Sequence, residues 1–221
     1  MNYKSNVVKK PWGYEYLAYE NDKVALWFLK ILRDHRTSTH CHPNKTTGLM
    51  VVDGHAEVSF LADSINLKNS EKIMIRKGLF HSTRACQNHL SLFEIETPVD
   101  KHDLVRLHDS YGRTGQPYED ETYEYPKESE CVWIKDPLPG ESETYNFDGQ
   151  SIKVISVQTL DHLKEISRSS NVMFLKGGLL TEYGVAVASP GDIVSSNVLQ
   201  RLLDVFNKVD EGTIVLIHEG E

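Results

Sequence analysis

The sequence predicts an all-β fold of the sandwich or barrel type. Short apolar or alternating segments recur along the chain, and turn signals such as Asp53–Gly54 and Lys77–Gly78 separate them. Helical periodicity is limited to two short segments in the C-terminal half. A chain of 221 residues is long enough for one large domain or two small ones with a real hydrophobic core.

The N-terminal half contains strand candidates at residues 24–32, 49–52, 56–60, 72–76 and 89–96. The first is almost continuously apolar, which is typical of a strand buried on both faces. The second leads into Asp53–Gly54, which predicts a hairpin to the third, where apolar and polar residues alternate. The fourth is followed by Lys77–Gly78, and the fifth stops at Pro98. Short strands at this spacing indicate a sandwich or barrel.

The C-terminal half returns to the strand pattern after a polar stretch. It contains strand candidates at residues 152–157, 172–175, 184–188 and 213–217, and helix candidates at 160–166 and 196–208. Turns around Gly177 and Gly191 match those around Gly54 and Gly78, which suggests an internal repeat and two similar β-barrels. The stretch between the halves, 114–139, is acidic, and we interpret it as a surface connection.

The composition argues against several classes of function. The net charge is −8, whereas a nucleic-acid-binding surface needs a basic face. The N-terminal residues lack the apolar core of a signal peptide, and no apolar run reaches the roughly 18–20 residues that span a bilayer. The three cysteines have no Cys-x-x-Cys spacing, which suits a reducing compartment. We therefore expect a cytoplasmic protein with neither a nucleic-acid nor a membrane partner.

A pair of histidines marks the candidate site. His40 and His42 are two residues apart, so on a strand both side chains project to the same side and could bind one metal ion. His81 is the best candidate for a third ligand, because it lies three residues after Gly78 on the strand that leaves the turn. The alternative is that these histidines are polar residues at a barrel mouth without a metal.

The spacing of these residues resembles the motifs of the cupin family. Those motifs are His-x-His, four residues, Glu, six residues and Gly, followed later by Gly-x-x-His. Here His40-Cys41-His42, Thr47 and Gly54 fit the first spacing, and Gly78 to His81 fit the second. The resemblance covers residues 10–113 and implies a double-stranded β-helix, the jelly-roll barrel of the cupins.

A narrower resemblance lies at the two ends of this module. Residues 10–17, KPWGYEYL, and 103–113, DLVRLHDSYGR, resemble segments that flank the cupin module of type II mannose-6-phosphate isomerases. They also resemble cupins associated with nucleotidyltransferases of surface-polysaccharide synthesis. Such modules are cytoplasmic, often dimeric, and handle phosphorylated or nucleotide-linked sugars. The resemblance therefore implies a small anionic sugar substrate and a homodimer.

The resemblance also implies a domain organisation. Residues 1–113 form the cupin barrel, 114–139 the acidic connection, and 140–221 a degenerate cupin-like lobe with one or two helices. In that lobe Val194 stands at the position that matches His81, and no His-x-His precedes Gly177. A second lobe without these histidines would serve packing or dimerisation.

One departure from the motif affects the chemistry. Thr47 occupies the position of the family's glutamate ligand, which leaves three neutral imidazoles. Such a set suits a divalent transition metal such as Zn²⁺, Fe²⁺, Ni²⁺ or Mn²⁺, with open positions for water or substrate. Without the carboxylate the ion keeps its full positive charge, which favours an anionic substrate and weakens metal affinity.

Further candidates lie around the three histidines. Lys45 falls where isomerase-type cupins carry a basic residue, and could bind a sugar phosphate or move a proton. Glu94 and Glu96 share one face of a strand, and either could act as general base. Arg106 and Arg113 belong to a predicted ion-paired clasp and are candidates for phosphate binding. A solvated lysine and salt-bridged carboxylates are the alternative interpretations.

These observations lead to one main functional hypothesis and two alternatives. The main hypothesis is a metal-dependent isomerase or epimerase that acts on a sugar phosphate or nucleotide sugar in surface-polysaccharide synthesis. The first alternative is an iron dioxygenase, because some cupins of that type use three histidines. The second is a non-catalytic sugar-binding or regulatory cupin, which both Thr47 and the second lobe favour.

Overall fold

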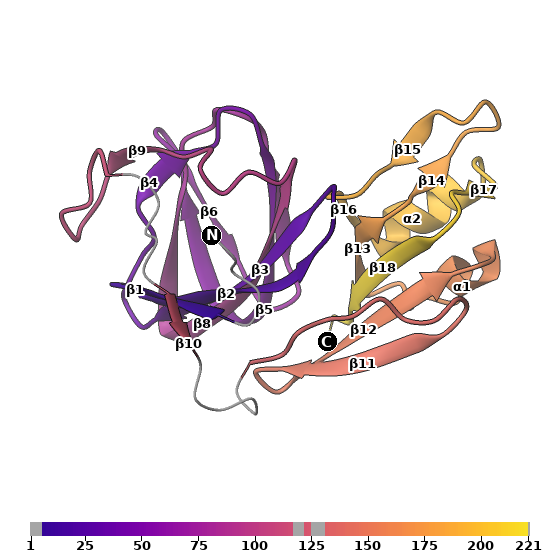
Figure 1. The fold of residues 1–221 in the computed structure, drawn as a ribbon, viewed down its shortest axis with the longest axis horizontal. Coiled ribbons are helices and arrows are strands. Elements are labelled where there is room, and N and C mark those ends of the chain that lie inside the picture. The colour runs from indigo at the N-terminus through magenta and orange to yellow at the C-terminus, as the bar shows by residue number, and fades with distance from the viewer. Residues whose placement is uncertain (1–5, 117–121, 125–130, 221) are drawn as a thin grey trace. The chain divides into compact units, whose positions relative to one another are not determined.

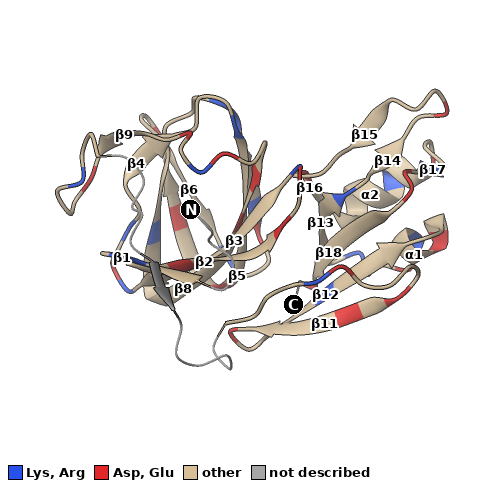
Figure 2. Ribbon diagram, viewed as in Figure 1, with Lys and Arg blue, Asp and Glu red and all other residues tan. Residues whose placement is uncertain are grey.

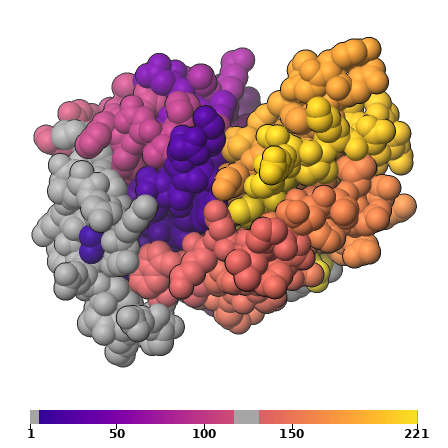
Figure 3. Space-filling model, turned by 45° about the vertical axis from the view of Figure 1, so that its right-hand side comes forward, coloured from indigo at the N-terminus to yellow at the C-terminus, as the bar shows by residue number. Residues whose placement is uncertain are grey.

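The computed structural model describes residues 6–116, 122–124 and 131–220, and consists mostly of antiparallel strands with two short helices (Figure 1). The all-β prediction is confirmed. The chain forms two compact units, residues 1–133 and 134–221. The residues of each unit lie together, those of the first coloured indigo to magenta and those of the second coral to yellow (Figure 3). Much of the predicted acidic connection, 114–139, lies outside the described residues, so its boundaries stay predictions.

The N-terminal unit is a curved antiparallel barrel. Its strands are β1 (Asn6–Lys10), β2 (Gly13–Glu20), β3 (Ala25–Leu32), β4 (Thr39–Cys41), β5 (Thr46–Ser59), β6 (Ser64–Leu67), β7 (Lys72–Ile75), β8 (Ser82–Thr97), β9 (Val105–His108) and β10 (Thr122–Glu124). The large sheet has the order β10-β1-β2-β3-β8-β5-β6, with β7 also paired to β5, and β4 pairs with β9. A bridge between His40 and His81 joins the two sheets.

The long strands β5 and β8 form the centre of this barrel. Strand β8 pairs with β3 on one side and with β5 on the other, so it is an interior strand of the sheet. The apolar residues of these strands meet in one cluster, whose fully buried members include Trp27, Leu29, Val51 and Leu92. Strand β3 is buried on both faces, as its continuous apolar run predicts.

The hairpin predicted at Asp53–Gly54 is wrong, because β5 continues through both residues. The pairing of β5 with β8 shifts register on either side of Gly54. Gly54 has a φ of +101°, and a Cβ built there would lie 2.4 Å from the backbone oxygen of His89. The glycine therefore permits a bulge and close approach to β8, which lets one long strand bend around the barrel. The turn predicted at Lys77–Gly78 is confirmed, with Gly78 at a φ of +71°.

The C-terminal unit combines two antiparallel sheets with two helices. Its elements are β11 (Ser142–Phe147), β12 (Gln150–Val157), α1 (Leu160–Lys164), β13 (Asn171–Lys176), β14 (Leu179–Leu180), β15 (Ala186–Ala188), β16 (Ile193–Ser195), α2 (Ser196–Leu203), β17 (Lys208–Val209) and β18 (Thr213–His218). One sheet has the order β11-β12-β18-β13-β16, and the other β15-β14-β17. Leu163 of α1 and Leu199 of α2 pack in one cluster with Phe174 and Ile217.

Both predicted helices are present but end earlier than their periodicity predicts. Helix α2 ends at Leu203 because the chain must turn into β17 at Lys208, although Phe206 still packs against the core. No helix in the described ranges is long and apolar enough to cross a membrane. Acidic and basic residues occur along the ribbons of both units rather than in separate blocks (Figure 2).

Candidate metal centre

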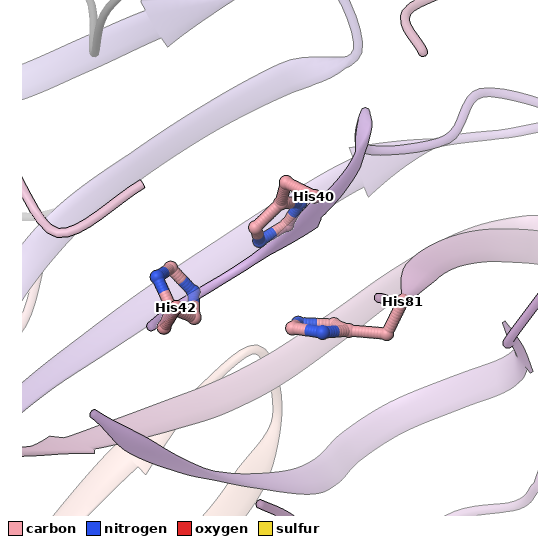
Figure 4. A group of neighbouring side chains, drawn as sticks. All are labelled: His40, His42 and His81. Atoms are coloured by element: carbon pink, nitrogen blue, oxygen red, sulfur yellow. The ribbon is translucent and has the colours of Figure 1, made fainter. Parts of the chain in front are cut away.

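The barrel brings the three predicted histidines together. His40 lies on β4, His42 follows that strand, and His81 directly precedes β8. Two backbone hydrogen bonds join His40 and His81, from each N–H to the other's carbonyl, at 3.0 and 2.8 Å. The three rings face a common space (Figure 4), and one nitrogen of each lies within 4.8 Å of the others. The strand bridge therefore fixes the spacing between His40 and His81 before any ion binds.

Hydrogen bonds to the backbone orient all three rings in the same way. In each ring Nδ1 contacts a carbonyl oxygen, which can only accept a hydrogen bond, so Nδ1 carries the hydrogen. The acceptors are the carbonyls of Ser38, Asp103 and Leu79, at 2.8, 2.6 and 3.0 Å from Nδ1 of His40, His42 and His81 respectively. The lone pair of each neutral ring is then on Nε2. Metal-binding histidines are commonly anchored by such a bond.

Burial keeps the three rings neutral. It lowers the pKa of His40 well below its usual value, and the neighbouring His81 and His42 lower it further. Burial and the charge of Lys45 lower the pKa of His42 to about 4, and burial also lowers the pKa of His81. Nε2 of His42 is buried without a hydrogen-bond partner in the described part of the chain. An orphaned, unprotonated nitrogen among two similar ones fits a divalent cation.

Two carboxylates of β8 face the same space. Oε1 of Glu94 lies 3.8 Å from Nε2 of His42, and Oε1 of Glu96 lies 4.0 Å from it. The ammonium of Lys45, a residue only 1% exposed, donates to Oε1 of Glu96 at 2.7 Å. The structure therefore places Lys45, Glu94 and Glu96, all predicted from the sequence, beside the histidines.

The two carboxylates have different protonation chemistry. Burial alone would raise the pKa of Glu96, but Lys101 and Lys45 outweigh it and lower the pKa to about 2. Burial and the negative charge of Glu96 raise the pKa of Glu94 to about 7. Glu96 is thus a fixed anion, whereas Glu94 can take up or release a proton near neutral pH.

A small pocket of about 50 Å³, partly open to solvent, adjoins this cluster. Its lining includes His40, His42, Lys45, Glu94 and Glu96, together with Lys10, Trp12, Glu15, Lys101, Arg106 and Arg113. The pocket therefore combines the candidate ligands with a mixed-charge wall in the N-terminal unit. Sequence reasoning missed Lys101, whose ammonium lies 3.6 Å from the centre of the Trp27 ring and 3.2 Å from Glu15. No local pattern points to it, because its partners come from β2 and β3.

The two predicted arginines line the pocket and also tie its rim together. Arg113 forms an ion pair with Asp109 at 2.7 Å. Arg106 donates to Oγ of Ser38 at 3.1 Å and to the carbonyl of Gln116 at 2.8 Å. These contacts link the segment after β9 to the residues that precede β4. The role of the arginines in phosphate binding stays a prediction.

No family model and no curated protein matches the chain. Similar solved structures include KdgF from Halomonas sp., with 15% identity and a TM-score of 0.41, covering 45% of this chain and 94% of that one. A cupin-2 domain protein from Shewanella frigidimarina has 20% identity and a TM-score of 0.35, covering 38% and 78%. A sugar phosphate isomerase of the cupin superfamily from Silicibacter pomeroyi has 10% identity and a TM-score of 0.33, covering 35% and 52%.

Proposed function

We propose that the protein is a metal-dependent isomerase or epimerase that acts on a sugar phosphate or nucleotide sugar in surface-polysaccharide synthesis. The observation that carries the proposal is the convergence of three neutral, backbone-anchored histidines beside a pocket that also holds Glu94. The substrate class comes from the resemblance to type II mannose-6-phosphate isomerases and polysaccharide cupins. A cytoplasmic homodimer belongs to the same proposal.

The donor set supports a divalent transition metal held by His40, His42 and His81. Three unprotonated Nε2 atoms suit Zn²⁺, Fe²⁺, Ni²⁺ or Mn²⁺, and the buried Nε2 of His42 gains the partner that it lacks. When bound, such an ion supplies Lewis acidity at a substrate oxygen that becomes negatively charged during reaction.

Glu94 is the proton-transfer group of this proposal. Its carboxylate lines the pocket, its side chain is 13% exposed, and its pKa of about 7 suits a base at neutral pH. It removes the proton on the carbon next to the substrate carbonyl and returns it to the former carbonyl carbon, while the hydroxyl proton of the first carbon passes to the former carbonyl oxygen, which completes an aldose–ketose conversion. Arg106 and Arg113, on the same pocket wall, hold the anionic end of the sugar.

Proton exchange with solvent tests the proposal directly. Metal-loaded protein is incubated in D₂O with hexose 6-phosphates and nucleotide sugars, and deuterium next to the carbonyl is followed by NMR. We expect exchange and product formation with one substrate. Glu94→Gln should slow both by about 10²- to 10⁴-fold while metal is retained.

Two further measurements on the same protein test the alternatives. Oxygen uptake by the iron-loaded protein, without proton exchange, supports the dioxygenase. Sugar binding that persists after metal removal, without turnover, supports the binding module, in line with Thr47 at the glutamate position. Either result overturns the isomerase.

A further inference from the structure

Thr47 leaves the proposed centre without the carboxylate ligand that the cupin motif places at this position. The residue is 1% exposed, and its hydroxyl oxygen has no hydrogen-bond partner among the described residues. We infer that Glu96 supplies the carboxylate ligand of the metal centre from the neighbouring strand, and that Lys45 orients it. The inference rests on the proposed metal-dependent function, and extends it to a four-ligand centre of three histidines and one glutamate.

The strand register places Glu96 beside Thr47. Thr47 on β5 is the direct partner of Glu96 on β8. Paired residues of antiparallel strands project to the same face, with Cβ atoms about 4.5–5.5 Å apart. A carboxylate at position 96 on β8 therefore reaches the same face of the sheet as a carboxylate at position 47 on β5 would.

The carboxylate of Glu96 lies within metal-ligand distance of His42. A metal ion binds nitrogen and oxygen ligands at about 2.1 Å, so two donors on one ion lie at most about 4.2 Å apart. Oε1 of Glu96 lies 4.0 Å from Nε2 of His42, within that limit. The donor atoms of His42, Glu94 and Glu96 lie within 4.8 Å of one another, so His42 belongs both to this group and to the group of three histidines.

Lys45 and Asp103 provide the outer support that a ligand needs. The ammonium of Lys45 donates to Glu96 at 2.7 Å, while the backbone N–H of Lys45 donates to the Asp103 carboxylate at 3.0 Å. The carbonyl of the same Asp103 accepts the hydrogen bond from Nδ1 of His42. A carboxylate has about four lone-pair sites, so the contact with Lys45 leaves others for the ion. Asp103 therefore orients His42 directly and Glu96 through Lys45.

Glu94 provides a matched control for the test. It lies two residues away on the same face of β8, and its Oε1 is 3.8 Å from Nε2 of His42, against 4.0 Å for Glu96. Its side chain is 13% exposed, whereas that of Glu96 is 1% exposed and accepts the contact from Lys45 at 2.7 Å. The test measures the affinity of the full chain for Zn²⁺ and Co²⁺ by competition with a chelator. We expect Glu96→Gln to weaken binding by at least about tenfold and Glu94→Gln to change it much less.

A double variant controls for possible destabilisation of the barrel by Glu96→Gln. Glu96→Gln leaves the Lys45 ammonium buried without its anion, which can itself destabilise the barrel. Thr47→Glu combined with Glu96→Gln returns a carboxylate to the facing strand, and we expect it to recover most of the lost affinity. The inference is overturned if Glu96→Gln binds metal as tightly as the wild type or if Glu94→Gln loses more affinity. It is also overturned if the double variant recovers none of the lost affinity. Wild-type protein that binds neither ion instead removes the proposed centre itself.

Discussion

At the scale of single residues, the centre is organised around hydrogen bonds that precede any ligand. Each histidine uses Nδ1 to contact a backbone carbonyl, so the direction of its Nε2 lone pair follows from the strand geometry. Burial then makes protonation of the rings unfavourable. The same cost of burial acts on His218 in the C-terminal unit, where neither ring nitrogen has a hydrogen-bond partner among the described residues.

The pH dependence of stability should reveal His218. Burial lowers its pKa to about 4, below the usual histidine value of about 6.5, so the unfolded chain binds the proton more readily. The free energy of unfolding should therefore fall by about 2 kcal/mol between about pH 7 and pH 4.5 through this residue. His218→Leu should remove that part of the slope in urea titrations. An unchanged slope would contradict the assignment, and the exposed His102→Leu is the control.

Sequence alone could predict the three histidines but not the full set of groups around them. His40 and His42 share a face through local strand geometry, and the glycine turn places His81. The pairing of Thr47 with Glu96 depends on the register between β5 and β8, which residue spacing does not encode. The carbonyl of Asp103 reaches His42 from 61 residues away, so no local pattern indicates it.

At the scale of elements, the bend in β5 allows one strand to serve both the core and the site. Its first part carries Thr47 opposite Glu96, and its last part pairs with β6 beyond Gly54. The sequence predicts a hairpin there, because Asp-Gly is a turn signal in a chain whose partner strands are unknown. The close approach of β8 converts the same two residues into a bulge.

Gly54→Ala should therefore destabilise the N-terminal unit by about 2 kcal/mol or more. The added methyl would lie 2.4 Å from a backbone oxygen, and the backbone would need an unfavourable positive φ. Gly112→Ala separates the two causes, because Gly112 has a φ of +81° but no atom within 4 Å of its built Cβ. Chemical denaturation of both variants gives the comparison. Equal losses would show that the contact with β8 has no cost.

At the scale of the whole molecule, the described site residues all belong to the N-terminal unit. Each unit has its own apolar cluster, and Val132 donates to the Tyr16 hydroxyl inside the first unit. Residues 1–133 alone should therefore fold and bind metal with the stoichiometry of the full chain. Metal titration of this fragment checks the expectation. A folded fragment without metal would show that the second unit completes the site.

The metal content of the purified full chain tests the central claim most directly. Plasma mass spectrometry of untagged wild-type protein should find one divalent transition metal ion per chain, before or after reloading. His40→Ala and His81→Ala should both lose it, because each removes one of the three converging imidazoles. Wild-type protein that stays free of metal after reloading, or variants that keep the full amount, would contradict the metal centre proposed here.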